Sequence, residues 1–151
     1  MSGTGTFSVL SSSERMDWPT PRDYFAELHA EFDFTVDACA RADNAKLPRF
    51  WSERDEGLMQ SWKGERVYMN PPYGRQLPRW IEKAWNEIGH AELIVALIPA
   101  RVDTSYWHDY IFGHAEIRFL RGRLRFEGAA NVAPFPVAVV IWRCAAGAVD
   151  E

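Results

Sequence analysis

RVYMNPPYGRQLPRWIEKAWNEIGHAELIVALIP (residues 66–99) is the stretch that decides the fold. It opens on a short apolar run, residues 66–69, and closes on a continuous apolar run, residues 92–99, which is typical of a strand buried on both faces of a parallel sheet. Between the two runs, apolar residues recur at i, i+3, i+4, i+7, i+8 and i+11: Leu77, Trp80, Ile81, Ala84, Trp85 and Ile88. This spacing predicts an amphipathic helix, so the whole stretch predicts a strand, a helix and a second strand.

The same alternation of helix and strand continues on both sides of this stretch. Thr20 and Pro21 offer an N-cap and a first-turn proline for an upstream helix. The other predicted elements are a strand within residues 32–40 that rises to Asp37, a short helix at 56–62, a helix at 103–112, strands at 115–120 and 135–142, and a turn with a short strand within 121–128. This order predicts a three-layer α/β fold.

Composition indicates one globular domain and excludes several classes of protein. The chain has 151 residues, of which 47% are apolar, and a net charge of −4, which argues against a generally basic nucleic-acid coat protein. Two distant cysteines and four scattered histidines form neither a disulfide framework nor a metal motif, so we expect a metal-free protein of a reducing cytoplasm. No run is long enough to span a membrane, and the start does not resemble a signal peptide.

The turn after the strand at residues 66–69, Asn70-Pro71-Pro72-Tyr73, is too rigid for an ordinary connection. Two prolines fix φ at about −65° and supply no N–H donors, so the carbonyls around them are held still and can accept hydrogen bonds. The turn lies at the carboxyl end of a strand, which is where open α/β sheets bind ligands. Asp37 and residues 99–101 end other predicted strands at the same edge.

A planar aromatic amine, such as the exocyclic amino group of adenine, suits this corner. Its lone pair is conjugated into the ring, and attack on a methyl donor requires the nitrogen to become tetrahedral. The Asn70 side-chain oxygen and the Pro71 carbonyl can accept its N–H bonds, and such fixed acceptors help most in the transition state. Tyr73 would stack on the base, and a base in a duplex would first flip out.

Asn70-Pro71-Pro72-Tyr73 matches the catalytic (N/D/S)-P-P-(Y/F/W) motif of S-adenosylmethionine-dependent amino methyltransferases. Over residues 17–142 the chain resembles the short phage and prophage DNA N6-adenine methyltransferases, called Dam-like. The shared stretches are DWPTPRDYF, FTVDACA, DNAK, NPPYG, LIPARVDTSYW, AEIRFLRGRLRF and APFPVAVVIW. The resemblance implies a Rossmann-like fold with a reduced, mostly parallel sheet and an antiparallel C-terminal hairpin. It also implies S-adenosylmethionine as cofactor, adenine in double-stranded DNA as target, and a phage- or prophage-encoded enzyme in the bacterial cytoplasm.

The chain departs from the wider methyltransferase pattern in two places. Ala-Cys-Ala-Arg-Ala-Asp follows Asp37 where a glycine-rich turn is usual. The interval between Asp37 and Asn70 is also short, so we expect the seven-strand sheet to have lost strands there. For a carboxylate that binds the ribose, Asp43 is the nearest candidate after the first strand.

The resemblance also implies residues that bind the cofactor. Asp37 corresponds to the acid that binds the methionine ammonium group, and Thr20 and Pro21 lie near the methionine carboxylate, at a helix N-terminus that attracts anions. Asp55 corresponds to the acid that accepts from the adenosine amino group, with the adjacent Glu56 as an open alternative. The alternative without a cofactor is that Asp37 is a solvated carboxylate at a strand end and that Thr20 and Pro21 form an ordinary helix cap.

Arginines gather in one segment of this net-acidic chain. Eight consecutive residues without an acid contain Arg118, Arg121, Arg123 and Arg125. On an alternating strand the last three would share one face, which predicts contacts with DNA phosphates; the alternative is an edge strand guarded by charge. Arg101, at the end of another strand, is a candidate to line the base pocket.

The leading hypothesis is therefore an adenine-specific DNA methyltransferase, with two alternatives. The same corner methylates glutamine side chains in proteins and bases in RNA, and a protein with this fold can bind nucleic acid without catalysis. We expect residues 17–145 to form the methyltransferase domain, and residues 1–16 and 146–151 to be tails.

Overall fold

The structure, a computed structural model, describes residues 18–144, so the expected tails at 1–16 and 146–151 lie outside the described residues. In chain order the elements are α2 (Arg22–Phe32), β1 (Val36–Asp37), η1 (Gly57–Met59), β2 (Arg66–Met69), α3 (Leu77–Glu87), β3 (Leu93–Pro99), η2 (Trp107–Ile111), β4 (Glu116–Phe119) and β5 (Val137–Arg143). No helix within residues 18–144 is both long enough and apolar enough to cross a membrane.

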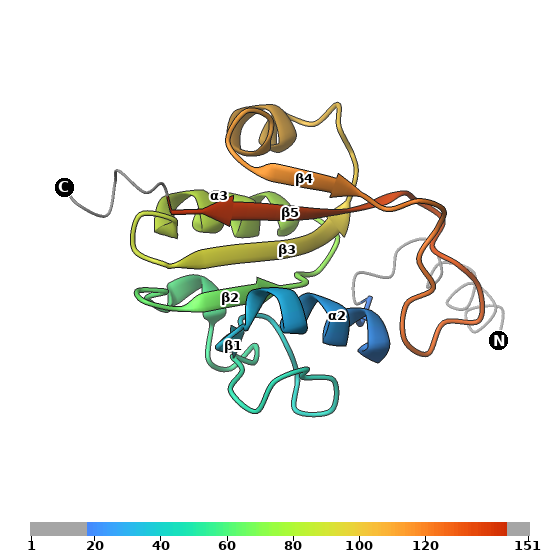
Figure 1. The fold of residues 1–151 in the computed structure, drawn as a ribbon, viewed down its shortest axis with the longest axis horizontal. Coiled ribbons are helices and arrows are strands. Elements are labelled where there is room, and N and C mark those ends of the chain that lie inside the picture. Colours follow the sequence, from blue (N-terminus) through green and yellow to red (C-terminus); the bar gives the residue numbers. More distant parts are fainter. Residues whose placement is uncertain (1–17, 145–151) are drawn as a thin grey trace, which may run out of the picture.

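The strands form one open, five-stranded sheet in the order β1-β2-β3-β5-β4. β1, β2 and β3 are parallel, whereas β5 runs antiparallel to both β3 and β4. α2 covers one face of the sheet, and α3 covers the other, where it packs against η1 and η2 (Figure 1). The expected three-layer α/β fold is confirmed, with a parallel first half and an antiparallel C-terminal pair of strands.

β3 is the centre of the core. All seven of its residues are buried, as expected for the continuous apolar run. It pairs in parallel with β2 from Arg66↔Leu93 to Met69↔Ala96, and it pairs with β5 in the antiparallel sense along its whole length. The stretch that predicted the fold is therefore also the one around which the sheet is built.

The rigid corner connects β2 to α3. β2 ends at Met69, and α3 begins at Leu77 with a proline in its first turn, where a missing N–H costs little. The buried residues of α3 are those of the predicted face: Leu77, Trp80, Ile81 and Ala84. Because the helix packs against the sheet through this face, the corner between them is held on both sides.

Residues 38–65 seal the outer edge of β1 without adding a regular strand. Asp37 and Phe50 form an isolated parallel bridge, and the Trp51 N–H donates to the Asp37 carbonyl at 2.9 Å. This segment stands where strands were expected to be lost, and its docking fixes the turn that carries Asp55.

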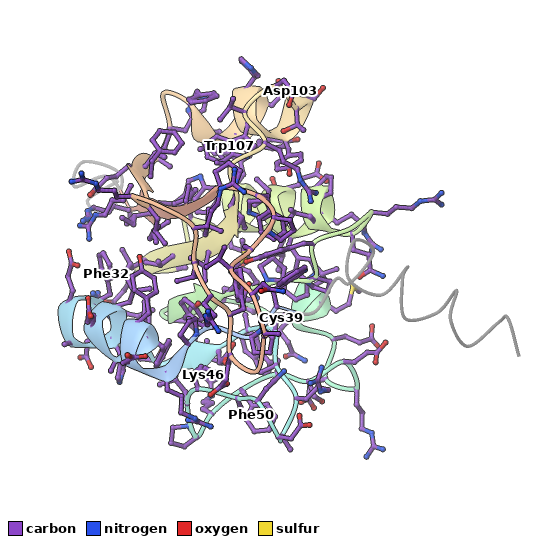
Figure 2. The ribbon with its side chains drawn as sticks, turned by 90° about the vertical axis from the view of Figure 1, so that its right-hand side faces the viewer. Phe32, Cys39, Lys46, Phe50, Asp103 and Trp107 are labelled. Carbon is purple, nitrogen blue, oxygen red and sulfur yellow. The ribbon has the colours of Figure 1, made fainter. Side chains whose placement is uncertain are left out.

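The short strand expected within residues 121–128 is absent, since no strand lies between β4 and β5. Residues 120–136 form a loop instead, here called the arginine loop, which reaches Lys46 through Glu127 (Figure 2). Two hydrogen bonds hold the loop against itself: Arg125 Nη1 donates to the Ala130 carbonyl at 3.0 Å, and the Ala133 N–H donates to the Leu124 carbonyl at 2.7 Å. The alternation of arginine and apolar residues therefore imitates a strand without forming one.

Two helix predictions also need correction. The helix expected over residues 103–112 is replaced by η2, a π-helix of five residues that buries Trp107 and Ile111. The N-cap of α2 is Pro21, without a side-chain cap, because the Thr20 hydroxyl bonds elsewhere. Thr20 thus belongs to the site described next and not to the helix end.

Candidate active site

Asn70 lies at the carboxyl end of β2 with its amide orientation fixed by its neighbours. Its Nδ2 donates to the Trp18 backbone carbonyl and, at 3.1 Å, to Thr20 Oγ1. A carbonyl can only accept, so Nδ2 must face Trp18 and Oδ1 must face the other way. The side-chain oxygen is therefore presented as an acceptor.

The Tyr73 hydroxyl lies between two acceptors, 2.6 Å from Asn70 Oδ1 and 2.7 Å from the Leu97 carbonyl. A single O–H proton serves one of them at a time, so donation to Leu97 leaves Asn70 Oδ1 available. The Tyr73 ring is 4% exposed, and Phe126 and Phe135 meet it edge to face at centroid distances of 6.0 and 5.8 Å. The ring that was expected to stack on a base is covered by the arginine loop in this conformation.

Pro71 adds a second acceptor beside Asn70. Within residues 18–144, no backbone N–H donates to the Pro71 carbonyl. Pro71 is buried and Pro72 half-buried, and neither supplies an N–H. The corner thus holds one side-chain oxygen and one backbone oxygen on the same rigid segment.

Asp37 ends β1, the strand next to β2, and is 3% exposed. Its Oδ2 accepts the Lys46 backbone N–H at 3.0 Å, whereas Oδ1 has no hydrogen-bond partner among the described residues. Burial raises the pKa of Asp37 to about 6, and the backbone N–H groups of Lys46 and Cys39, with the charge of Lys46, offset only part of that rise. A buried carboxylate oxygen without a partner is costly, and a ligand ammonium group would satisfy it. The residue therefore fits the amino end of a methionine-type cofactor.

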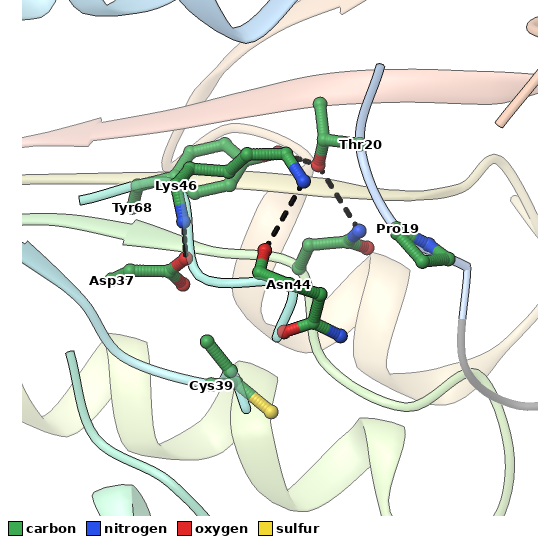
Figure 3. A pocket seen from close by; sticks show the side chains of 9 residues that line it. Pro19, Thr20, Asp37, Cys39, Asn44, Lys46 and Tyr68 are labelled. Atoms are coloured by element: carbon green, nitrogen blue, oxygen red, sulfur yellow. Dashed lines mark hydrogen bonds between the residues drawn. The ribbon is translucent and has the colours of Figure 1, made fainter. Parts of the chain in front are cut away.

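One pocket brings together three of the predicted residues: Thr20, Asp37 and Asn70 (Figure 3). The rest of its lining is Pro19, Cys39, Ala40, Asn44, Lys46 and Tyr68; Pro21, the N-cap of α2, is not part of it. The cavity itself is about 20 Å³, which is room for about one water molecule. In this conformation the pocket must therefore widen before it can admit a cofactor.

The structure does not place Asp55 in the lining of this pocket. Asp55 is exposed, and its Oδ2 accepts the Ser52 backbone N–H at 2.9 Å and the Ser52 hydroxyl at 3.0 Å, which lowers the pKa of Asp55. The alternative, Glu56, is also exposed. The next residue, Gly57, packs so closely that a Cβ would lie 2.3 Å from the Ala38 carbonyl oxygen. Both acids are thus held near the carboxyl end of β1 but outside the pocket.

The arginines predicted to contact phosphate fall into two groups. Three of them are exposed on the arginine loop: Arg121, Arg123 and Arg125. The strand face that they were expected to share does not exist, because the loop is irregular. Arg118 lies in β4 and donates to both carboxylate oxygens of Glu31, at 2.8 and 2.7 Å, so its charge is already compensated within the fold.

Arg101 follows β3 at the same edge of the sheet as Asn70. It is exposed, and its guanidinium lies 5.8 Å from the centre of the Phe135 ring, which belongs to the arginine loop. The Arg101 carbonyl accepts the Thr104 hydroxyl at 2.8 Å, as in a helix cap. Its side chain therefore adds a positive charge beside the loop that carries the other three.

Sequence reasoning missed Lys46, which is one of the pocket residues. Its side chain is only 3% exposed, and its Nζ donates to Glu127 Oε1 at 2.9 Å and to the Asn44 carbonyl at 3.1 Å. The stretch DNAK drew attention to this segment, but a lysine in a polar connection predicts a solvated side chain. Asp43, the candidate for the ribose, is exposed and pairs with Arg41 at 3.0 Å. Residues 18–144 contain no group of three or more His, Cys, Asp or Glu placed to hold a metal ion.

A three-layer fold with an open sheet and a polar pocket at the carboxyl ends of its parallel strands is consistent with a Rossmann-like methyltransferase fold. The chain belongs to the DNA N-6-adenine-methyltransferase (Dam) family, whose sequence pattern matches residues 8–141. Membership of a methyltransferase family implies S-adenosylmethionine as the general methyl donor.

Two curated relatives come from bacteriophages, and both carry the name DNA N-6-adenine-methyltransferase. The chain is 28% identical over 113 residues to the protein of Haemophilus phage HP1, a match that covers 74% of this chain and 65% of the relative. It is 30% identical over 109 residues to the protein of Escherichia phage T1, with 71% of this chain and 45% of the relative covered. The chain therefore spans less than two thirds of each relative.

Proposed function

We propose that the protein transfers a methyl group from S-adenosylmethionine to the N6 amino group of adenine in double-stranded DNA, by direct in-line transfer to a flipped-out base. The observation that carries the proposal is the orientation of Asn70, whose Nδ2 is held by Trp18 and Thr20 so that Oδ1 is presented as an acceptor. Family membership and the names of both phage relatives support the same reaction.

The corner acts on the amine through two acceptors. Asn70 Oδ1 and the Pro71 carbonyl oxygen each accept a hydrogen bond from one N–H of the adenine amino group. Because they draw these N–H groups out of the plane of the base, they favour a tetrahedral nitrogen. Positive charge develops on that nitrogen during attack, so fixed dipoles stabilise the transition state more than the ground state. Tyr73 donates to the Leu97 carbonyl during this step and stacks on the base once the arginine loop uncovers its ring.

Asp37 and Thr20 form the cofactor side of the site. When bound, the cofactor supplies an electrophilic methyl group. Asp37 Oδ1, which has no partner within the described residues, accepts from its ammonium group, and Thr20 connects this end of the pocket to Asn70. Asp55 or Glu56, held near β1 by the close packing of Gly57, takes the adenosine amino group.

The DNA side consists of the exposed arginines beyond the same sheet edge. Arg121, Arg123 and Arg125 contact phosphates, and Arg101 lies beside the base. We leave Arg118 out of this set because Glu31 already binds its guanidinium.

The test is methyl transfer from labelled S-adenosylmethionine to unmethylated DNA, with modified nucleosides identified by mass spectrometry. Asn70→Ala should lose at least about 10²-fold in rate, as happens when a transition-state hydrogen-bond partner is removed. Asn86→Ala is the matched control, because Asn86 is exposed on α3 and should leave the rate unchanged. Methylated RNA or protein without methylated DNA would overturn the substrate assignment. Absence of all methyl transfer would favour a protein that binds nucleic acid without catalysis.

A further inference from the structure

An ion pair between a buried lysine and a partly exposed glutamate closes one side of the pocket. The Lys46 side chain is 3% exposed, and its ammonium group lies 2.9 Å from the carboxylate of Glu127, 81 residues further along the chain. An ammonium group removed from water needs a partner of opposite charge. Glu127 is the single acidic residue of the arginine loop, so that loop supplies the partner through one side chain.

Glu127 also fastens the arginine loop over the site. Its Oε2 lies 3.3 Å from Arg22 Nε, and its backbone N–H donates to the Pro19 carbonyl at 2.9 Å. The preceding residue, Phe126, is 1% exposed and packs against Tyr73. The loop therefore narrows the pocket and covers the Tyr73 ring at the same time.

The pocket wall presents one anion and one cation from neighbouring positions. Asp37 Oδ2 accepts the backbone N–H of Lys46, while Asp37 Oδ1 faces no partner within the described part of the chain. The side chain of Lys46 leads from this point toward Thr20 (Figure 3). An α-amino acid carries an ammonium and a carboxylate group on the same carbon, so a site for it needs such a pair.

We propose that Lys46 binds the carboxylate of the cofactor's amino-acid end, and that Glu127 occupies this place until the cofactor displaces it. The inference rests on the proposed function, because it takes S-adenosylmethionine as the ligand. Displacement releases the arginine loop, enlarges the pocket and uncovers Tyr73. Cofactor binding is thereby coupled to the position of the arginines that contact DNA. The apparent affinity for the cofactor is then the intrinsic affinity multiplied by the fraction of molecules whose loop is open.

The experiment is a calorimetric binding measurement with two ligands. S-adenosylmethionine and its decarboxylated form share the ammonium group and differ in the carboxylate. Lys46→Met keeps the backbone N–H that binds Asp37. It should lower the ratio of the two affinities, carboxylated over decarboxylated, by about tenfold or more, as expected when one partner of a buried charge pair is truncated. Glu127→Gln should instead raise the affinity for S-adenosylmethionine by roughly severalfold, because it weakens the internal competitor.

Matched variants separate the possible results. Glu92→Gln breaks an exposed pair with Arg66 and should change neither affinity. If Lys46→Met lowers the affinities for both ligands equally, the lysine only supports the pocket. If Glu127→Gln binds S-adenosylmethionine more weakly, Glu127 is part of the cofactor site. Either result overturns this inference and leaves the proposed function standing. A wild-type protein that does not bind S-adenosylmethionine overturns the inference and the proposed function together. Thermal unfolding of each variant checks that it is folded.

Discussion

Asp37 carries a carboxyl group that folding makes harder to ionise. Burial raises its pKa from 3.8 to about 6, so between these values the unfolded chain releases a proton that the native protein keeps. Native stability attributable to this group is therefore full below about pH 4 and is lost as pH rises toward 6. The loss amounts to about 3 kcal/mol for two pKa units.

Asp37→Asn should therefore stabilise the ligand-free protein at neutral pH. We expect the free energy of unfolding to rise by on the order of 2–3 kcal/mol at pH 7 and to change little near pH 4, where the wild-type carboxyl is protonated. Urea unfolding at both pH values measures this. An equal effect at the two pH values would mean that the substitution acts through packing and not through ionisation.

The positions of single site residues could be predicted where they follow from the ends of predicted strands. Asp37 and Asn70 end adjacent parallel strands, and strand ends at one sheet edge lie together. Lys46 and Glu127 were not predictable, because their pairing joins a polar connection to a loop 81 residues away. The cover over Tyr73 was missed for the same reason, since Phe126 reaches the ring through the tertiary fold.

η1 packs against the end of β1 through its first residue, Gly57. A Cβ on Gly57 would lie 2.3 Å from the Ala38 carbonyl oxygen and 3.0 Å from the Trp80 ring, and the first of these is backbone that cannot rotate away. Gly57→Ala should lower the free energy of unfolding by about 1–3 kcal/mol or more, as overpacked substitutions do. It should also displace Asp55 and Glu56 from the end of β1.

Gly89→Ala is the matched control for this substitution. Gly89 follows α3, has no positive φ, and has no atom within 4 Å of an added Cβ. Its replacement should leave stability unchanged or slightly raised through the unfolded state. Equal urea midpoints for the two variants would contradict the close packing of the η1 turn.

Helices and strands were predicted correctly where the spacing of apolar residues was distinctive. The amphipathic spacing of α3 and the short continuous apolar run of β3 predicted a helix and a buried strand, and both formed as expected. The arginine loop has the alternation of a strand but pairs with no neighbouring strand, and Arg125 instead donates to the Ala130 carbonyl within the loop. Alternating polar and apolar residues thus predict which side chains are buried. Whether the segment becomes a strand depends on a neighbouring strand with which its backbone can pair.

The whole molecule combines a net charge of −4 with exposed arginines on one loop. The three-layer arrangement was predicted from the alternation of helices and strands along the chain. The position of the exposed arginines was not, because it depends on the path of the arginine loop. Arg118, which sequence grouped with the others, is turned to Glu31 instead. The net-acidic molecule thus carries a local positive surface on the arginine loop, and the proposed contact with DNA phosphates depends on this surface and not on the net charge.

Salt dependence of DNA binding tests this distribution of charge. Each arginine that contacts a phosphate releases counterions, so Arg121→Ala, Arg123→Ala and Arg125→Ala should each lower the slope of log affinity against log salt concentration by about one. Arg118→Ala should leave the slope unchanged, because its guanidinium pairs with Glu31 and Glu116. Fluorescence anisotropy with a labelled duplex at several salt concentrations measures all four. A reduced slope for Arg118→Ala alone would show that DNA binds along β4, and the arginine loop would then serve only to close the pocket.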